Sequence, residues 1–278
     1  MSDSKKNGTR GGAAGDGPAV VANPSKPHLI HCSYHKCLTV YYGRVMKAVF
    51  NLCQPWSRGY RHYNSHLDDF YSGFRQHRIA SVNNRFLDLD RLGSFRLTRF
   101  VRDPRDLVVS GYFYHRRGSE PWLTIQNPTE SDWYFANGRV PDELQGRGAS
   151  FVEYLRSVPE EEGLLAELEF RRYHFESMMR WPTEHPDILT LRYEEILAAG
   201  PEVFGRLLRF YGLSTLQQRL GTWFGRRYSL ERLKKRKSDP HIRNPSSGQW
   251  RKHFTPRVQQ AFDDRFGGLV ERLGYPPS

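Results

Sequence analysis

Lys36 and Thr39 lie in a short polar turn between a predicted strand, Leu29–Ser33, and a predicted helix, Thr39–Leu52. The first turn of a helix has unpaired N–H groups and the positive end of the helix dipole, so it attracts anions. A lysine ammonium and a threonine hydroxyl beside these groups would strengthen the binding of a phosphate. The turn lacks the Gly-x-x-x-x-Gly-Lys-Ser/Thr pattern of nucleoside triphosphatases, which disfavours ATP hydrolysis. The alternative is an ordinary turn whose lysine faces solvent.

A second segment repeats this arrangement further along the chain. The predicted strand Phe95–Val101 is followed by Arg102 and then by a helix. Arg102 at the end of the strand and Ser110 two turns into the helix have a spacing that would allow both to touch one phosphate. Arg105 and Asp106 are expected to pair with each other or to cap the helix. Two such helix starts on one sheet predict a ligand with phosphates at both of its ends.

The composition favours an anionic partner. The 278 residues carry a formal charge of +12, which suits nucleic acid, a phosphate-bearing small molecule or an acidic sugar. Three cysteines, Cys32, Cys37 and Cys53, form no C-x-x-C pair, so we expect a reducing compartment. The sequence shows neither a membrane-spanning stretch nor the apolar core of a signal peptide. We expect a disordered leader over residues 1–27 and a soluble, cytoplasmic protein.

Strand-like and helix-like segments alternate along the rest of the chain. Further strands are predicted at Arg78–Val82 and Asp187–Leu191, and further helices at Phe151–Arg156, Gly163–Trp181, Val203–Tyr211, Leu216–Arg226 and Pro256–Leu273. This alternation predicts an α/β fold in one domain, residues 28–278, with a parallel central sheet flanked by helices on both faces. Residues 116–148 have no clear period and are expected to form a long surface insertion.

Four segments, in order, resemble the motifs of the PAPS-dependent sulfotransferases. Ser33–Thr39 resembles the family's 5′-phosphosulfate loop, and Val101–Ser110 looks like its 3′-phosphate motif. Leu189–Glu195 is similar to a later strand that ends in Tyr-Glu-Asp, and Arg243–Arg251 to a late Gly-rich basic loop. The matches span nearly the whole chain after the leader. The resemblance implies a P-loop-like sheet. The run Lys234–Lys237 before the last motif is interpreted as a solvated charged surface.

The resemblance implies transfer of a sulfuryl group from 3′-phosphoadenosine 5′-phosphosulfate (PAPS) to an acceptor hydroxyl or amine, with 3′,5′-adenosine bisphosphate (PAP) as product. This donor has phosphates at both ends of one adenosine, which agrees with two anion sites on one sheet. Lys36 would stabilise the leaving phosphate; such an in-line transfer needs positioning and charge, and no metal. The cofactor site implied by the family motifs comprises Lys36, Cys37, Leu38, Thr39, Val40, Arg102, Ser110, Tyr173, Tyr228, Arg243 and Asn244.

The phosphate loop departs from the family pattern at two positions. Leu38 and Val40 stand where the family usually has Gly and Thr. We therefore expect either a less open loop or a negative φ at Leu38, where Gly would be permissive. Cys37, at a helix N-terminus, is expected to have a lowered pKa and to be reactive.

The general base also departs from the family pattern. Asn83 occupies the place where cytosolic members have a His, and an amide does not take up a proton at neutral pH. His35, which replaces a family Pro beside Lys36, is the first candidate for the base; alternatively it only caps the turn. The reserve candidates are His66, Asp68 and His77.

The acceptor is not identified by the sequence. We expect its pocket and lid in the aromatic stretch 56–74 and the insertion 116–148, with plain core packing as the alternative for the aromatic residues. The acceptor would be a small molecule, such as a phenol or lipid-like alcohol, or a carbohydrate such as an acidic sugar; the oligomeric state stays open.

Two competing functions remain. A P-loop kinase would need a Mg²⁺-binding hydroxyl where Cys37 stands. A nucleic-acid or polyanion binder without catalysis would leave both strand–turn–helix motifs unexplained, so no nucleic acid is expected as a partner.

Overall fold

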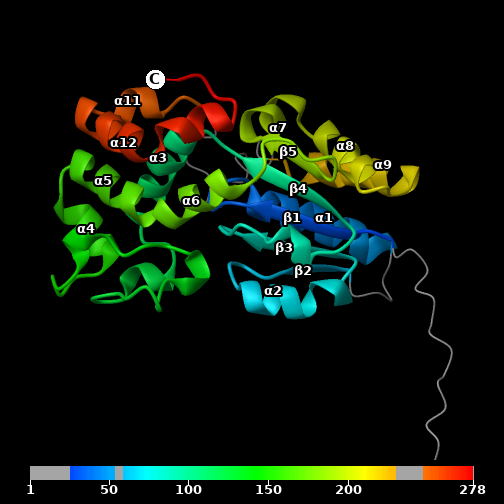
Figure 1. Cartoon of the computed structure of the whole chain (residues 1–278), viewed down its shortest axis with the longest axis horizontal. Helices are drawn as coiled ribbons and strands as arrows, with labels where there is room; N and C mark the ends of the chain where they lie inside the picture. The colour runs from blue at the N-terminus through cyan, green and yellow to red at the C-terminus, as the bar shows by residue number, and fades with distance from the viewer. Residues whose placement is uncertain (1–25, 54–58, 230–246, 278) are drawn as a thin grey trace, which may run out of the picture.

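A five-stranded parallel sheet forms the centre of the molecule. The computed structural model describes residues 26–53, 59–229 and 247–277. The strand order is β2-β3-β1-β4-β5, and each neighbouring pair is parallel (Figure 1). The strands are β1 (His28–Ser33), β2 (Tyr60–His62), β3 (Ile79–Asn83), β4 (Phe95–Val101) and β5 (Ile188–Arg192). The predicted α/β fold with a parallel sheet is confirmed.

Helices cover both faces of the sheet. They are α1 (Thr39–Cys53), α2 (Leu67–Gly73), α3 (Pro104–His115), α4 (Phe151–Ser157), α5 (Glu160–Phe170), α6 (Arg172–Arg180), α7 (Tyr193–Ala199), α8 (Glu202–Phe210), α9 (Thr215–Arg227), α11 (Trp250–His253) and α12 (Pro256–Arg272). On one face, Leu29 of β1 packs with side chains of α1 and α8. On the other, Ile30 packs with Phe70 of α2 and with Trp181, which follows α6. Successive strand residues thus point into opposite hydrophobic layers, as a sheet buried on both faces requires.

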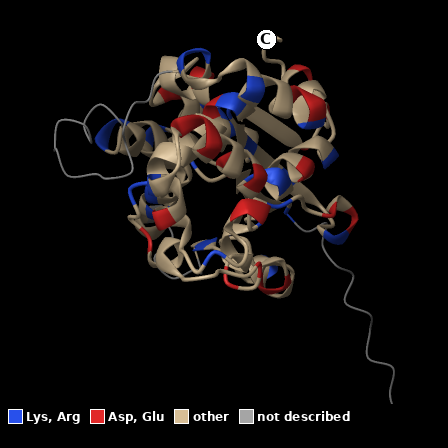
Figure 2. Ribbon diagram, turned by 90° about the vertical axis from the view of Figure 1, so that its left-hand side faces the viewer, with Lys and Arg blue, Asp and Glu red and all other residues tan. Residues whose placement is uncertain are grey.

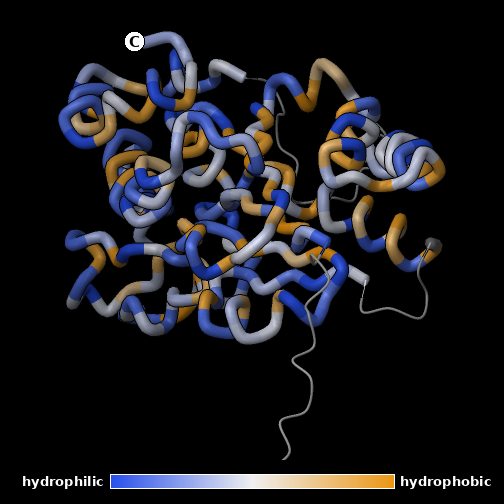
Figure 3. Tube along the Cα trace, turned by 45° about the vertical axis from the view of Figure 1, so that its right-hand side comes forward, coloured by the Kyte–Doolittle hydropathy of each residue, from blue (hydrophilic) through white to orange (hydrophobic). Residues whose placement is uncertain are grey.

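A third hydrophobic cluster lies beyond the carboxyl ends of the strands, where α3, α4, α5, α6 and α12 gather (Figure 1). In Figure 3 hydrophobic and hydrophilic segments alternate along the trace. Helix α3 is buried almost all round, and only Ser110 and Phe113 are partly exposed in it. Among the residues that the structure describes, no helix combines the length and apolarity needed to cross a bilayer.

Residues 116–148, the expected surface insertion, carry many exposed residues but also several buried apolar side chains. They contain three short 3₁₀-helices, η3 (Pro121–Thr124), η4 (Tyr134–Ala136) and η5 (Asp142–Leu144). Leu123, Trp133 and Leu144 are fully buried in the third cluster. The stretch shows no hydrophobic period because its buried apolar side chains belong to turns and short 3₁₀-helices and not to regular helices or strands.

Other sequence predictions differ from the structure at particular places. The predicted helix Gly163–Trp181 is divided at Arg171 into α5 and α6. Strand β2, helix α2 and helix α7 were not predicted. The expected leader, the run Lys234–Lys237 and the predicted ligands Arg243 and Asn244 lie wholly or almost wholly outside the described residues.

A buried ion-pair network joins α3 to the junction of α5 and α6. Glu167 accepts hydrogen bonds from Arg171 Nε at 2.8 Å and from His115 Nδ1 at 2.6 Å. All three side chains are fully buried. A buried charge is costly when it loses its partner, so this network tolerates little displacement.

Gly111 leaves the space that this network occupies. A Cβ at Gly111 would lie 1.9 Å from Glu167 Oε1 and 2.3 Å from Arg171 Nη2. We expect Gly111→Ala to lower the free energy of unfolding by about 3 kcal/mol, because it overpacks the helix contact and separates a buried pair. Urea denaturation measures the change.

Gly268→Ala in α12 is the matched control, because a Cβ there meets nothing within 4 Å. It should raise stability by about 0.5–1 kcal/mol through the helix propensity of alanine. Equal stability of the two variants would contradict the role assigned to the network.

Candidate functional site

The turn between β1 and α1 has an unusual backbone. Lys36 has φ +73° and Leu38 φ +62°, both in the left-handed region. Of the two expectations for this loop, a negative φ at Leu38 is therefore wrong: the chain keeps the glycine-like conformation with a leucine. Each such residue costs about 1–3 kcal/mol and persists only where its surroundings hold it.

Side chains from distant segments hold this turn. Asn84 Oδ1, after β3, accepts a hydrogen bond from the backbone N–H of His35 at 2.7 Å. Arg171 Nη1 donates to the carbonyl of His35 at 3.4 Å, and Arg102 Nη1 donates to the carbonyl of Lys36 at 3.5 Å. The turn is thus fixed by three segments that meet only in the folded protein.

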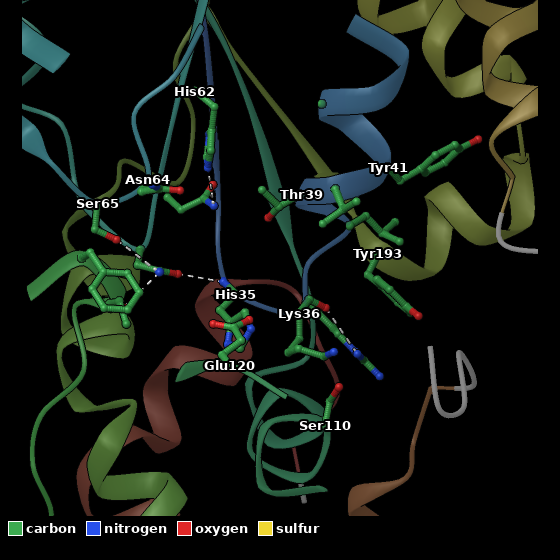
Figure 4. Close-up of a pocket in the computed structure, with 18 of the residues that line it drawn as sticks. His35, Lys36, Thr39, Tyr41, His62, Asn64, Ser65, Ser110, Glu120 and Tyr193 are labelled. Carbon is green, nitrogen blue, oxygen red and sulfur yellow. Dashed lines mark hydrogen bonds between the residues drawn. The ribbon is translucent and has the colours of Figure 1, made fainter. Parts of the chain in front are cut away.

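The turn opens into a cavity of about 550 Å³ at the carboxyl edge of the sheet (Figure 4). Carboxyl ends of parallel strands are where α/β proteins bind ligands. The predicted residues that line it are His35, Lys36, Leu38, Thr39, Val40, Arg102 and Ser110. Its further lining residues include His62, Asn83, Glu120, Trp122 and Phe135. The two predicted anion sites therefore belong to one cavity.

Lys36 carries its ammonium 3.9 Å from the centre of the Tyr114 ring. Burial, and after it the nearby cations Arg117, Arg102 and Arg171, lower its pKa from 10.5 to about 7, while Glu120 acts in the opposite direction. An excess of positive charge at a buried lysine favours an anionic ligand, because an anion would relieve the repulsion.

Arg102 lies between the ends of β4 and α3 and is 3% exposed. Its guanidinium lies over the Tyr193 ring, 4.2 Å from the centre. Among the described residues its buried Nε has no hydrogen-bond partner. A buried arginine nitrogen without a partner, beside the hydroxyl-bearing Ser110 in one cavity, fits a phosphate that would accept from both.

Asp106 does not pair with Arg105, as we had expected as one option. Arg105 instead pairs with Asp103 at 2.8 Å. The carboxylate of Asp106 accepts hydrogen bonds from the backbone N–H groups of Gly248 at 2.6 Å and Trp250 at 3.0 Å. These contacts bring the end of the late basic segment next to the second anion site, where Gln249 lines the cavity.

Cys37 does not have the reactive thiol that we expected. Its side chain is 1% exposed and packs in the third hydrophobic cluster. Burial raises the pKa of the thiol to about 12. The backbone N–H of Cys37 donates to the carbonyl of Tyr34 at 2.9 Å, so it closes the turn and does not point to a ligand. Desolvation raises the pKa of this thiol by more than the helix N-terminus lowers it.

Tyr173 and Tyr228, two of the residues predicted for the cofactor site, do not line the cavity. The Tyr173 hydroxyl donates to Glu130 at 2.9 Å, and the Tyr228 ring stacks on Phe224. Two other tyrosines, Tyr41 of α1 and Tyr193 at the start of α7, line the cavity instead.

Sequence reasoning missed Tyr41, Tyr193 and His62. Tyr193 follows β5 directly, so the rule that strand ends bear ligand residues was enough to find it. Tyr41 lies in the first turn of α1. His62 ends a strand of three residues inside an irregular aromatic stretch, and the sequence gave no signal for that strand. The reserve candidates His66, Asp68 and His77 do not line the cavity.

Comparisons with known proteins identify a matching family model and solved structures of similar fold. The family model described as "Sulfotransferase domain" matches residues 94–274. The solved structure of mouse sulfotransferase SULT7A1 complexed with PAP is 15% identical and covers 88% of this chain and 84% of its own, with a TM-score of 0.50. A retinol dehydratase in complex with androsterone and inactive cofactor PAP is also 15% identical, covers 89% and 82%, and has a TM-score of 0.49. A search of curated proteins found no match.

Replacing Lys36 by Met tests whether the cavity holds a destabilised cation. Because the folded-state pKa lies near 7 and the ordinary value is 10.5, the unfolded chain binds a proton between these values that the folded protein does not. The stability of the wild type should therefore rise with pH across this window relative to Lys36→Met. Below pH 7 Lys36 is protonated in both the folded and the unfolded protein, so the buried charge then lowers the stability of the fold by its full amount.

Urea denaturation of both proteins between pH 6 and 9 measures this difference. Lys252→Met, at an exposed position of α11, is the control and should follow the wild-type pH dependence. Parallel curves for wild type and Lys36→Met would show that the lysine is not strained by its surroundings.

Proposed function

The chain belongs to the sulfotransferase family, and we propose that it transfers the sulfuryl group of PAPS to an acceptor hydroxyl or amine and releases PAP. The observation that carries this proposal is the shared cavity: the turn of Lys36 and the segment of Arg102 and Ser110 open into one space of about 550 Å³. A ligand with phosphates at both ends of a nucleoside would contact both.

The residues present fit such a donor. Lys36 and Thr39 would hold the 5′ end, with Leu38 and Val40 at the entrance of the loop, and Arg102 and Ser110 would hold the 3′ phosphate. Arg102 Nε, which has no hydrogen-bond partner in the described part of the chain, and the lowered pKa of Lys36 both support an anion there. Arg243 and Asn244 remain proposed ligands from the sequence and lie outside the described residues. Tyr41 and Tyr193 offer aromatic surface for the base.

The transfer requires charge stabilisation at the leaving oxygen. PAPS supplies an activated sulfuryl group on its 5′ phosphate. The acceptor oxygen would bond to sulfur while the bond from sulfur to the phosphate oxygen breaks, and the Lys36 ammonium would neutralise the charge that accumulates there. A bound anion raises the pKa of Lys36 and keeps it protonated at neutral pH, because opposite charges favour the charged form.

His35 stays a candidate for the base that takes the acceptor proton. It lines the cavity, and its ring is stacked on His115 with 5.3 Å between the centres. Burial lowers its pKa well below 6.5, and His115, Lys36 and Arg171 lower it further. The ring is neutral at pH 7, but its cationic surroundings oppose protonation.

The insertion 116–148 is proposed to form the acceptor side of the site. Arg117, Glu120, Trp122 and Phe135 line the cavity from this unit. Tyr60 is the member of the aromatic stretch that does so, while Phe70 and Phe74 are core residues. A cavity with aromatic walls and cations suits a hydroxyl-bearing small molecule or carbohydrate.

The remaining features argue for this function over a polyanion binder. In Figure 2 basic and acidic ribbon segments lie side by side along the helices, whereas a nucleic-acid surface concentrates one sign of charge. For location we propose the cytoplasm, which the two free, buried cysteines Cys32 and Cys37 support.

Calorimetric titration with PAP tests the donor site. The wild type should bind PAP, and Arg102→Ala should weaken binding about 10- to 100-fold, because charge-assisted hydrogen bonds to a phosphate are lost. Arg206→Ala, at an exposed ion pair on α8, should bind like the wild type. No heat with PAP, or tighter binding of Mg²⁺-ATP or an oligonucleotide, would remove the assignment. A screen of phenols, alcohols and sugars with radiolabelled PAPS then identifies the acceptor.

A further inference from the structure

His62 ends β2 and faces the proposed acceptor space. Strand β2 pairs with β3, and the register places His62 beside Ser81. The imidazole lines the same cavity as Lys36 and lies next to Asn83, the residue at the end of β3 (Figure 4). A side chain on β2 therefore reaches over the end of β3 toward the turn that follows β1.

A directed chain of hydrogen bonds runs from the phosphate loop to this histidine. The Ser33 hydroxyl donates to Asn83 Oδ1 at 2.9 Å, and Ser33 Oγ is 2.8 Å from Thr39 Oγ1. Since the single Ser33 proton is used on the amide oxygen, Ser33 accepts from Thr39. Asn83 then presents its Nδ2 to His62 Nε2, at 3.4 Å. An amide nitrogen is only a donor, so Nε2 of His62 must be the acceptor.

The contact at the other ring nitrogen is compatible with this tautomer. His62 Nδ1 lies 2.8 Å from Ser81 Oγ, which also contacts the Tyr60 hydroxyl at 2.7 Å. With Nε2 as acceptor, a neutral ring carries its proton on Nδ1 and donates it to Ser81. Burial lowers the pKa of His62, and hydrogen bonds with Asn64 and Ser81 oppose that shift. The ring is thus neutral, and the lone pair on Nε2 is held only by the long contact from Asn83 Nδ2.

We propose that His62 is the general base of the sulfuryl transfer, with Asn83 and Ser81 as the residues that position it. This inference rests on the proposed function. The acceptor hydroxyl would replace the long contact from Asn83 Nδ2 and give its proton to His62 Nε2. At the same time its oxygen bonds to sulfur and the bond to the 5′ phosphate breaks, so PAP leaves with the electron pair. The imidazolium keeps its Nδ1–H on Ser81.

The surroundings favour His62 over His35 for this task. The charged and titratable neighbours of His62 are Arg61 and Tyr60 on β2 and His31 on β1, and Arg44 and Lys47 line the same cavity from α1. His35, by contrast, is depressed by a histidine, a lysine and a buried arginine together. A base must accept a positive charge, and His62 has fewer close cations that oppose it.

Water as acceptor makes the test independent of the natural acceptor. Release of sulfate from radiolabelled PAPS by the whole enzyme should fall about 100-fold or more in His62→Gln, in line with the loss of a general base. Transfer to 4-nitrophenol at slightly alkaline pH should fall less than about tenfold, because that acceptor is already ionised and needs no base. His62→Glu, which can also take a proton, should recover part of the hydrolysis.

The controls separate chemistry from folding. Each variant should bind PAP as the wild type does, and His185→Gln, before β5 at the opposite edge of the sheet, should hydrolyse PAPS normally. Ser81→Ala should move the acid limb of the pH profile to lower pH, because a hydrogen bond that favours the imidazolium is lost; a merely structural role would leave this limb in place. Wild-type hydrolysis by His62→Gln with an unchanged pH profile, or an equal loss with both acceptors, would overturn the proposal. A wild type that binds no PAP would instead remove the function on which it rests.

Discussion

The turn after β1 is the constraint on which the rest of the site depends. Lys36 and Leu38 both adopt left-handed backbone conformations without being glycine, and a free peptide would avoid them at about 1–3 kcal/mol each. The turn keeps this shape because Asn84, Arg102 and Arg171 bind its backbone from three other segments. The loop is therefore a product of the assembled sheet, and its geometry cannot precede the tertiary fold.

The same contacts gather positive charge at one place. Arg171 is neutralised by Glu167 in the buried network, whereas the ammonium of Lys36 is surrounded by a larger number of cations than carboxylates. Holding such a group in a partly closed cavity is unfavourable until an anion arrives. Backbone strain and charge repulsion thus both act on Lys36. A doubly phosphorylated nucleoside would relieve the charge repulsion.

The sequence was informative where one segment determines its own structure. Strands β1 and β4 are apolar runs followed by a helix start, so their ends, with Lys36 and Arg102, were placed correctly at one edge of a parallel sheet. The sequence was uninformative where the conformation or burial of a residue depends on contacts with distant segments. The φ of Leu38 and the burial of Cys37 follow from contacts with other segments, and Trp133 is buried in an aperiodic stretch. Strand β2 has three residues and is defined only by pairing with β3.

The unpredicted strand β2 changes the interpretation of Asn83. In the sequence alone, an amide at the end of β3 only means that the proton acceptor expected at this position is missing. In the structure the amide lies between two groups that have fixed roles: its oxygen accepts from Ser33, which touches Thr39 of the phosphate loop, and its nitrogen faces His62. An amide has one fixed donor end and one fixed acceptor end, whereas a neutral imidazole can carry its proton on either nitrogen and an aliphatic side chain offers neither group. Asn83 therefore links Ser33 to His62 by hydrogen bonds. In the proposed mechanism the proton acceptor is supplied by β2 and would be oriented by the end of β3.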